Sequence, residues 1–464
     1  MRRATFIMTT LVSLCLSVRS FAGWTEPVFI DSGDELFELG IEARNDSVCI
    51  TYNFVPPKFL RSLDDGLTWQ DEFLLPERSL AVDALKLQGD TLVMFHGGDG
   101  IQFHFSTNFG ATWEGPRNCG SYPDLDRAWA DFNSSLVTVC NAHYLHEETT
   151  VSLKHSTDFG ITWAEPESIW MYPHPVDPFF AYFFDRPYIL SSDLDPWANS
   201  FIKLLFTADD GESWISYDSL CGPGTNWEQR MDASPGGQMA IVYMDWDSDL
   251  EEDSRIFVCL SPDSGLTWTP PTNLSVADVN RYPRVAVSGD TVVVAWQGHV
   301  DSTDEFSSVL LQRTYDFGQT WQPVEVLSEP GSPGGHPSIE LVNGKIHLLC
   351  AGWYGGIPGI YYMRWEPESG VEEEIVTPLR ISLHSYPNPF NATTTISYSL
   401  PERGEVSISI YNLIGQRVAT VFERAQEAGE HTVTWDARDF PSGVYFARLE
   451  TGESTETIKM VLLK

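Results

Sequence analysis

Five arginines and one histidine near the starts of short apolar segments are the side chains best suited to binding or chemistry. Arginine presents a planar fork of N–H donors that grips a carboxylate through two hydrogen bonds. A cluster of them predicts recognition of an anionic ligand, and the structural alternative is neutralisation of an acidic rim. The candidates are Arg127, Arg186, Arg230, Arg281, Arg284 and His336.

Aromatic residues occur in the predicted loops beside these cationic side chains. An aromatic ring offers a broad apolar face together with a polar edge, and such rings stack on sugars. We therefore expect a surface that binds a glycan or a protein. The aromatic residues are Tyr172, Trp197, Trp227, Trp353 and Tyr354.

Three carboxylates alternate at Asp245, Asp247 and Asp249, and further acidic residues follow. Hard oxygen ligands at this spacing can surround calcium. The position that would be the sharp-turn glycine of an EF-hand loop is Leu250. A calcium loop and a solvated acidic loop both stay open as interpretations, and no cofactor other than calcium is expected.

The charge balance restricts the partners. The chain has 65 acidic and 28 basic residues, a formal net charge of −37. Such a surface repels nucleic acid and anionic membranes. Arg2 and Arg3 precede an apolar stretch and then Ser20-Phe21-Ala22, which predicts a signal peptide over residues 1–23. No later apolar run is long enough to span a membrane, so an exported protein without a membrane span is expected.

The cysteine spacing fits neither a metal site nor a dense disulfide scaffold. Cys49, Cys140, Cys259 and Cys350 lie in apolar strand-like runs and are predicted to be buried thiols. Cys119 and Cys221 lie in predicted loops, and no pairing is assigned.

The elements that must position these residues follow from an eight-residue phrase, Ser/Thr-x-Asp-x-Gly-x-Thr-Trp, written six times. A fixed period of about 50 residues indicates a repeat architecture. Asp accepts backbone N–H groups in a turn, Gly supplies a positive φ, and Trp anchors the next strand. The recurring residues are Asp64, Asn108, Asp158, Asp209, Asp263 and Asp316, read as structural turn residues rather than as metal or catalytic carboxylates.

Each repeat reads as three strands before the phrase and one after it. The sixth repeat, for example, predicts strands over residues 284–287, 291–296, 308–313 and 321–326. A seventh unit lacks the phrase and a fourth strand. Residues 24–28 resemble the strands that follow the phrase, so we expect the N-terminal segment to complete the last sheet and remove its free edge. Seven propeller blades are favoured, and six are the alternative.

The lengths of the turns and loops predict which face of the propeller carries the functional site. The turn between the first two strands is tight in most repeats, and it shares a face with the repeated phrase because neighbouring strands are antiparallel. The loops on the opposite face are long and irregular. Binding residues usually lie on variable loops held by a rigid scaffold, so we place the site on this long-loop face, over the central channel.

The phrase resembles the Asp-box (BNR) repeat of the sialidase-like β-propellers, which implies an all-β propeller over residues 24–365. An active member needs three arginines around the sialic acid carboxylate, an acid/base Asp and a Tyr nucleophile paired with a Glu. By this resemblance Arg127, Arg230, Arg284 and Tyr354 are the catalytic candidates. The Phe/Tyr-Arg-Ile-Pro motif of active members has no counterpart at residues 36–41, and its nearest likeness, Phe184-Asp185-Arg186-Pro187, lies in the fourth unit.

The C-terminal part has a different sequence pattern. An acidic linker is predicted at residues 366–379, and short alternating strands over residues 380–464 predict a small Ig-like β-sandwich. Residues 386–391, 411–416 and 459–464 resemble the type A C-terminal sorting domain of type IX secretion cargo, which implies the secretion machinery as a partner and location outside a Gram-negative-type bacterium.

Three functions therefore remain open. The first is an exported propeller that binds a glycan or protein through its long-loop face. The second is a sialidase or related glycoside hydrolase, and the third is a structural component of a surface assembly. The fold alone does not choose among them, because one fold serves many functions.

Overall fold

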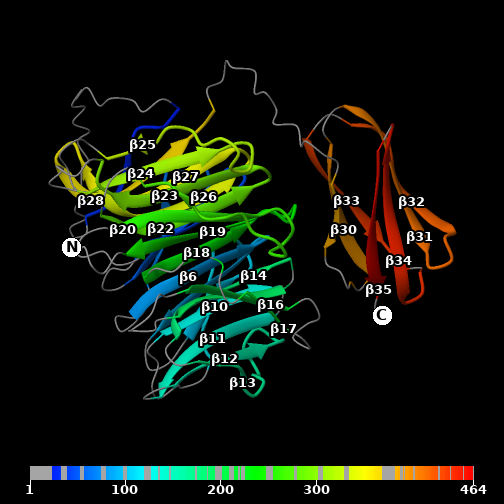
Figure 1. The fold of residues 1–464 in the computed structure, drawn as a ribbon, viewed down its shortest axis with the longest axis horizontal. Helices are drawn as coiled ribbons and strands as arrows, with labels where there is room; N and C mark the ends of the chain where they lie inside the picture. The colour runs from blue at the N-terminus through cyan, green and yellow to red at the C-terminus, as the bar shows by residue number, and fades with distance from the viewer. Residues whose placement is uncertain are drawn as a thin grey trace, which may run out of the picture.

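The computed structural model describes most of the chain after the predicted signal peptide (Figure 1). The described residues are 23–32, 39–52, 57–74, 80–97, 102–119, 127–133, 136–145, 148–172, 175–184, 186–193, 201–207, 214–217, 220, 225–246, 254–275, 279–300, 307–328, 334–367, 382–386, 390, 392–400, 403–426, 429–438, 440–452 and 454–462. They form strands β1 to β35 and no helix, so no helix among them could cross a membrane.

Seven four-stranded antiparallel sheets make up the first part of the chain. The first contains β2 (Leu39–Arg44), β3 (Ser47–Tyr52), β4 (Lys58–Ser62) and β5 (Gln70–Leu74). The second contains β6 (Leu80–Gln88), β7 (Thr91–Gly97), β8 (Gln102–Ser106) and β9 (Glu114–Asn118). The third contains β10 (Arg127–Asn133), β11 (Leu136–Leu145), β12 (Glu148–Ser156) and β13 (Glu167–Tyr172).

The remaining sheets repeat this order. The fourth contains β14 (Pro175–Phe183), β15 (Arg186–Asp193), β16 (Phe201–Thr207) and β17 (Trp214–Tyr217). The fifth contains β18 (Thr225–Ala233), β19 (Met239–Trp246), β20 (Ser254–Ser261) and β21 (Thr272–Asn273). The sixth contains β22 (Asn280–Ser288), β23 (Thr291–Gly298), β24 (Ser308–Thr314) and β25 (Glu325–Val326). The seventh contains β26 (Gly334–Val342), β27 (Lys345–Tyr354), β28 (Ile357–Trp365) and β1 (Val28–Asp31).

The seventh sheet joins the two ends of the propeller, as the sequence predicted. Strand β1 pairs antiparallel with β28, and Trp24 forms a further bridge with Trp365. In Figure 1 the blue start of the chain accordingly lies beside the yellow strand β28. The first strands of successive sheets contact one another around a ring, and β2 contacts β26 to close it. The propeller fold with its N-terminal closing strand is thereby confirmed.

Strand bounds differ from the prediction mainly at the outer edge of the sheets. In the sixth sheet the outermost strand covers only Glu325–Val326, not residues 321–326, and β22 begins four residues earlier than predicted. The apolar core lies between neighbouring sheets; Ile41 and Ile50 of the first, for example, pack with Leu349 and Tyr362 of the seventh.

The Asp-box phrase forms the turn between the third and fourth strands, as predicted. In the fifth sheet Asp263 Oδ1 accepts the Thr267 N–H at 2.7 Å, and Ser261 Oγ accepts the Gly265 N–H at 2.9 Å. In the five boxes that the structure describes, the residue before the glycine also has a positive φ, 58° at Ser264, which was not predicted. Its N–H donates to the tight inner turn of the same sheet, at Gly237 O here, so both turns lie on one face.

The second domain is a β-sandwich, drawn in orange and red in Figure 1. Its three-stranded sheet contains β29 (Ser382–Tyr386), β30 (Thr393–Leu400) and β33 (Gly429–Asp436). Its four-stranded sheet contains β32 (Arg417–Gln426), β31 (Gly404–Asn412), β34 (Gly443–Thr451) and β35 (Ser454–Leu462). Strand β29 was not predicted. The predicted domain boundaries stay predictions, since residues 1–22 and 368–381 lie outside the described part.

The predicted buried thiols at Cys49, Cys140, Cys259 and Cys350 are confirmed. Burial raises the pKa of each of the thiols Cys49, Cys140 and Cys350, to about 12 for Cys350. Cys119 is also a buried free thiol, and Cys221 lies outside the described residues. These cysteines pack as small apolar side chains.

Candidate functional site

Alternate residues of the innermost strands face the central channel, because side chains in a strand alternate between its two faces. One layer of such positions carries five charged side chains, which we call the charged ring. The charged ring consists of Glu42 on β2, Lys86 on β6, Asp131 on β10, Asp232 on β18 and Glu340 on β26. The equivalent positions on β14 and β22 are Ala181 and Ala286. This ring was not predicted from the sequence.

Two carboxylates of the charged ring bind the next sheet. Asp131 Oδ2 accepts the Tyr182 N–H at 2.9 Å, and Asp232 Oδ2 accepts the Val287 N–H at 2.7 Å. The channel-facing edge of an innermost strand has no neighbouring strand, so its N–H groups need other partners. These carboxylates therefore join neighbouring blades as well as giving the channel its charge.

The electrostatics of the charged ring favour neutral carboxyl groups. Burial raises the pKa of Glu42 to about 8 and that of Asp232 to about 6. Burial and the nearby Glu42 raise the pKa of Glu340 well above its ordinary value. Burial alone would lower the pKa of Lys86, but Asp131 and the glutamates outweigh it, so the pKa of this ammonium is raised. The channel thus holds one ammonium among acids that are partly protonated near neutral pH.

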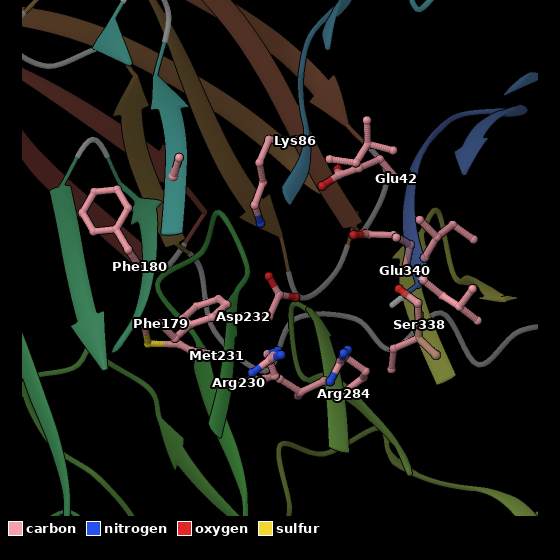
Figure 2. Close-up of a pocket in the computed structure, with 17 residues that line it drawn as sticks. Glu42, Lys86, Phe179, Phe180, Arg230, Met231, Asp232, Arg284, Ser338 and Glu340 are labelled. Carbon is pink, nitrogen blue, oxygen red and sulfur yellow. The ribbon is translucent and has the colours of Figure 1, made fainter. Parts of the chain in front are cut away.

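A cavity of about 150 Å³ lies on the long-loop side of the charged ring. Its floor, at the charged ring, includes Glu42, Lys86, Asp232 and Glu340, and its wall toward the long loops includes Arg230 and Arg284, which Figure 2 draws below the ring residues. Two residues before Glu42 and Glu340, strands β2 and β26 present the small Gly40 and Ser338 to the same cavity. The open space therefore lies on the side of the first and seventh sheets, next to the arginines of the fifth and sixth.

Arg230 and Arg284 occupy equivalent positions on the neighbouring strands β18 and β22. Each follows a bulge in the strand register, and each donates from Nη1 to the carbonyl just before it, Gln229 O at 2.9 Å and Pro283 O at 3.0 Å. The Arg230 guanidinium also lies 5.9 Å from the ring centre of Phe179. Figure 2 shows both guanidinium groups at the same wall of the cavity.

The bulges bring three further side chains to the mouth of the channel. Glu228, Tyr282 and His336 hold equivalent left-handed conformations, with φ of 54°, 54° and 49°. Glu228 Oε2 accepts the Tyr282 N–H at 2.6 Å, and the rings of Tyr282 and His336 stack with centres 4.2 Å apart. Burial, and then Arg284, lowers the pKa of His336. Non-glycine residues held in this strained region cluster at functional sites.

The structure brings together only part of the predicted site. Arg230, Arg284 and His336 meet at the long-loop mouth, whereas Arg281 is exposed on β22 outside the cavity lining. Arg127 begins β10 on the predicted face, and its side chain is not among those that the structure describes. The expectation for Arg186 was wrong: it begins β15, the second strand of its sheet, and lies on the Asp-box side of the charged ring. A tight turn, not a long loop, precedes this strand.

The aromatic candidates are dispersed. Tyr354 is buried and donates its hydroxyl to Leu327 O at 2.6 Å, so this hydroxyl supports the core between two sheets. Trp353 is 42% exposed at the end of β27. Tyr172 ends the outermost strand β13, away from the channel. Trp227 lies in β18 with its side chain outside the description, and Trp197 lies outside the described residues.

The calcium prediction is largely outside the described structure. Asp245 lies in β19, but Asp247 and Asp249 are not among the described residues. Within the described ranges no three His, Cys, Asp or Glu side chains form a group that could hold a metal ion. Asp209 of the fourth Asp-box is likewise not described.

Sequence comparison explains the C-terminal sandwich. Residues 384–463 match the family model of the secretion system C-terminal sorting domain. The chain is therefore exported by type IX secretion to the cell surface or the medium, and this domain interacts with the secretion machinery. No curated protein is significantly similar in sequence to the chain.

Solved structures resemble the chain at low sequence identity. A polysaccharide lyase, Uly1, is 9% identical over 70% of this chain and 88% of its own, with a TM-score of 0.47. Trypanosoma rangeli sialidase is 11% identical over 91% of this chain and 83% of its own, with a TM-score of 0.41. An α-L-arabinofuranosidase from Fusarium graminearum is 15% identical over 74% and 98%, with a TM-score of 0.41.

Proposed function

We propose that the exported propeller binds an acidic glycan at the long-loop end of its channel, with Arg230 and Arg284 holding the carboxylate of the ligand. One observation carries the proposal: two arginines at equivalent positions of neighbouring strands line the same cavity, beside the space left by the small Gly40 and Ser338 on the next two strands of the ring. Two guanidinium groups on one wall suit an anion, and the space beside them admits the body of the ligand.

The size of the cavity and the charge of the protein restrict the ligand to the end of a glycan chain. A cavity of about 150 Å³ has room for about one sugar residue and not for a folded partner. The formal charge of −37 repels long polyanions. A single terminal carboxylated sugar therefore fits better than an internal stretch of a polyanion.

The floor and rim supply groups for the rest of the sugar. Protonated carboxyl groups both donate and accept hydrogen bonds, as sugar hydroxyls do, and Glu42 and Glu340 lie beneath the open side of the cavity. The stacked Tyr282 and His336 rings border the arginine wall. These features support binding of a sugar acid over a simple anion.

Calorimetry of the exported protein with glucuronate and glucose tests the proposal. We expect glucuronate to bind and glucose to bind much more weakly. Arg230→Gln and Arg284→Gln should each weaken glucuronate binding about tenfold or more, the value of a charge-assisted hydrogen bond. Arg438→Gln, on the exposed side of the sandwich, is the matched control and should leave binding unchanged. Equal affinity for the two sugars would overturn the carboxylate assignment.

Hydrolysis of the bound glycan is the second candidate, favoured by the carboxyl groups in the same cavity. The raised pKa values of Glu42, Asp232 and Glu340 provide both protonated and ionised carboxyls near neutral pH, which is what general acid and base catalysis needs. Fluorogenic sialic acid and glucuronic acid glycosides test it. Turnover lost in Glu340→Gln would support hydrolysis, whereas binding without turnover of either substrate would leave a binding protein.

A further inference from the structure

The turn between β31 and β32 of the C-terminal sandwich exposes two apolar side chains. Leu413 is 72% exposed and Ile414 is 77% exposed, the highest values among the large apolar residues described. Neither belongs to the core of the sandwich, which Ile408, Ile410 and their neighbours form. The fold therefore does not bury these side chains, although exposing them to water is unfavourable.

The backbone of this turn is firmly held. Asn412 Oδ1 accepts the N–H groups of Ile414 at 3.2 Å and Gln416 at 2.9 Å. The Asn412 N–H donates to Gln416 O at 3.0 Å, and Gly415 takes a φ of 77°. A flexible apolar loop would lose conformational entropy on binding, whereas this turn is already ordered. An ordered apolar tip that is largely exposed to solvent is typical of a recognition element.

A hollow in the adjoining sheet extends this surface. It has a volume of about 520 Å³ and lies against Leu413 and Gly415. Tyr411, Phe446 and Arg448 line it, together with threonines of β35. These positions alternate along the strands with the core residues Ile410, Ala447 and Leu449, so they lie on the outward face of the four-stranded sheet. The tip and the aromatic hollow form one continuous surface, which we call the sorting-turn surface.

Three of the other exposed apolar residues owe their exposure to the Asp-box turn. Leu67, Ile161 and Leu266 are also exposed, but each directly follows the glycine of an Asp-box. Their exposure comes with the repeated turn geometry of the propeller. Leu413 and Ile414 have no such repeat, and they lie within the segment that matches the secretion sorting domain.

We propose that the sorting-turn surface is where the type IX secretion machinery docks, with Leu413 and Ile414 inserting into an apolar pocket of one of its protein components. The partner follows from the sorting-domain match, because that machinery must recognise the folded domain. Two apolar side chains on an ordered tip beside an aromatic hollow resemble the few central residues that carry most of the energy in protein interfaces.

Export of the full chain from a bacterium with type IX secretion tests this proposal. Leu413→Ser and Ile414→Ser, singly and together, are compared with Ile161→Ser, a propeller residue that is 71% exposed. We expect the double variant to accumulate in the periplasm, with about a tenfold fall in the exported fraction, as expected for loss of an interface hot spot. The Ile161→Ser variant should be exported normally. Leu413→Met, which keeps an apolar side chain at this position, should be exported like the wild type, in contrast to Leu413→Ser.

Two controls keep the outcome decisive. The melting temperature of each purified full-length variant must equal that of the wild type, so that retention reflects recognition and not misfolding; Ile414→Thr replaces any variant that melts early. Normal export of a folded double variant would overturn the proposal. Sedimentation of the wild type should show a monomer, and a dimer that dissociates on Leu413→Ser would overturn it in favour of pairing between two copies.

Discussion

Arg364 on β28 reaches across the propeller seam to Asp65 in the first Asp-box. Its Nη1 lies 2.7 Å from Asp65 Oδ2 and donates to Asp65 O at 2.5 Å. Lys345 Nζ also contacts Asp65 Oδ2, at 2.5 Å. The ends of the ring are thus joined by a nearly buried ion pair in addition to the pairing of β1 with β28.

The same contact to the box carbonyl recurs around the ring without the ion pair. Arg61 Nη1 donates to Phe109 O at 3.1 Å, and Tyr188 OH donates to Ser264 O at 3.1 Å. In each case a side chain of one sheet binds the carbonyl of the left-handed residue in the next Asp-box. The box is therefore a link between blades as well as a turn within one.

Replacing Arg364 should destabilise the whole propeller. Arg364→Met leaves the Asp65 carboxylate with Lys345 as its remaining close cation and removes one of the two donors to Asp65 O, the other being the Tyr362 hydroxyl at 3.3 Å. Because both partners are almost buried, we expect a loss of about 3 kcal/mol in the free energy of unfolding, measured in urea. Arg438→Met breaks the exposed pair with Asp436 and should produce no measurable change. Equal effects of the two substitutions would contradict the seam assignment.

The Asp-box hydroxyl should matter more than the charge of its carboxylate. Ser261 Oγ accepts the buried Gly265 N–H and donates to Asp263 Oδ1 at 3.0 Å. Ser261→Ala leaves this N–H without an acceptor and should cost about 1–3 kcal/mol in urea unfolding. Asp263→Asn keeps the acceptor oxygen and should cost little, since Asn108 already fills this place in the second box. A larger loss for Asp263→Asn than for Ser261→Ala would refute this ranking.

The charged ring should make the protein less stable at alkaline pH. The pKa of Glu42 rises from an ordinary 4.5 to about 8 in the fold, chiefly through burial. Its stabilising contribution is fully present below the unfolded value and is lost as the pH rises through about 8. Glu42→Gln keeps the neutral form and the acceptor oxygen. We therefore expect the variant to gain stability relative to the wild type between about pH 5 and about pH 9.

Urea unfolding at several pH values measures this gain. Glu114→Gln, whose side chain is 71% exposed, is the control and should follow the wild-type curve throughout. A constant difference between Glu42→Gln and the wild type at all pH values would mean that Glu42 is already ionised in the fold, which would rule out the neutral carboxyl.

The sequence predicted those features that repeat along the chain. The turn at Asp64 and its equivalents is predicted by residues that all lie within one eight-residue phrase. The sheets and the closing segment at Trp24 could therefore be inferred. The charged ring could not, because Glu42 and Glu340 meet only when the register of seven strands is known. The signal was present as single charged residues within apolar first strands. Arg186 was misplaced because its motif-like neighbours gave no indication of which strand of the sheet it begins.

One glycine of an Asp-box and one glycine of a tight turn have nearly equal φ. Comparing them separates the cost of backbone strain from the cost of overpacking. Gly66 has a φ of 82° and Gly344 a φ of 75°. A Cβ at Gly66 would lie 2.0 Å from Tyr362 Cε1, whereas at Gly344 it would meet nothing within 4 Å. Gly344→Ala should therefore cost only the left-handed strain, about 1–2 kcal/mol. Gly66→Ala adds overpacking of about 1–3 kcal/mol, because Tyr362 is buried between two sheets.

Urea unfolding of Gly66→Ala, Gly344→Ala and the double variant measures the difference directly. The two losses should add in the double variant only if the sites do not interact. Tyr362→Leu in the Gly66→Ala background should recover part of the packing loss, since it removes the ring that the new methyl group meets, and it should recover nothing in the Gly344→Ala background. Equal losses for the two single variants would show that Gly66 serves backbone conformation alone and that the contact between the Asp-box and the preceding blade contributes nothing to stability.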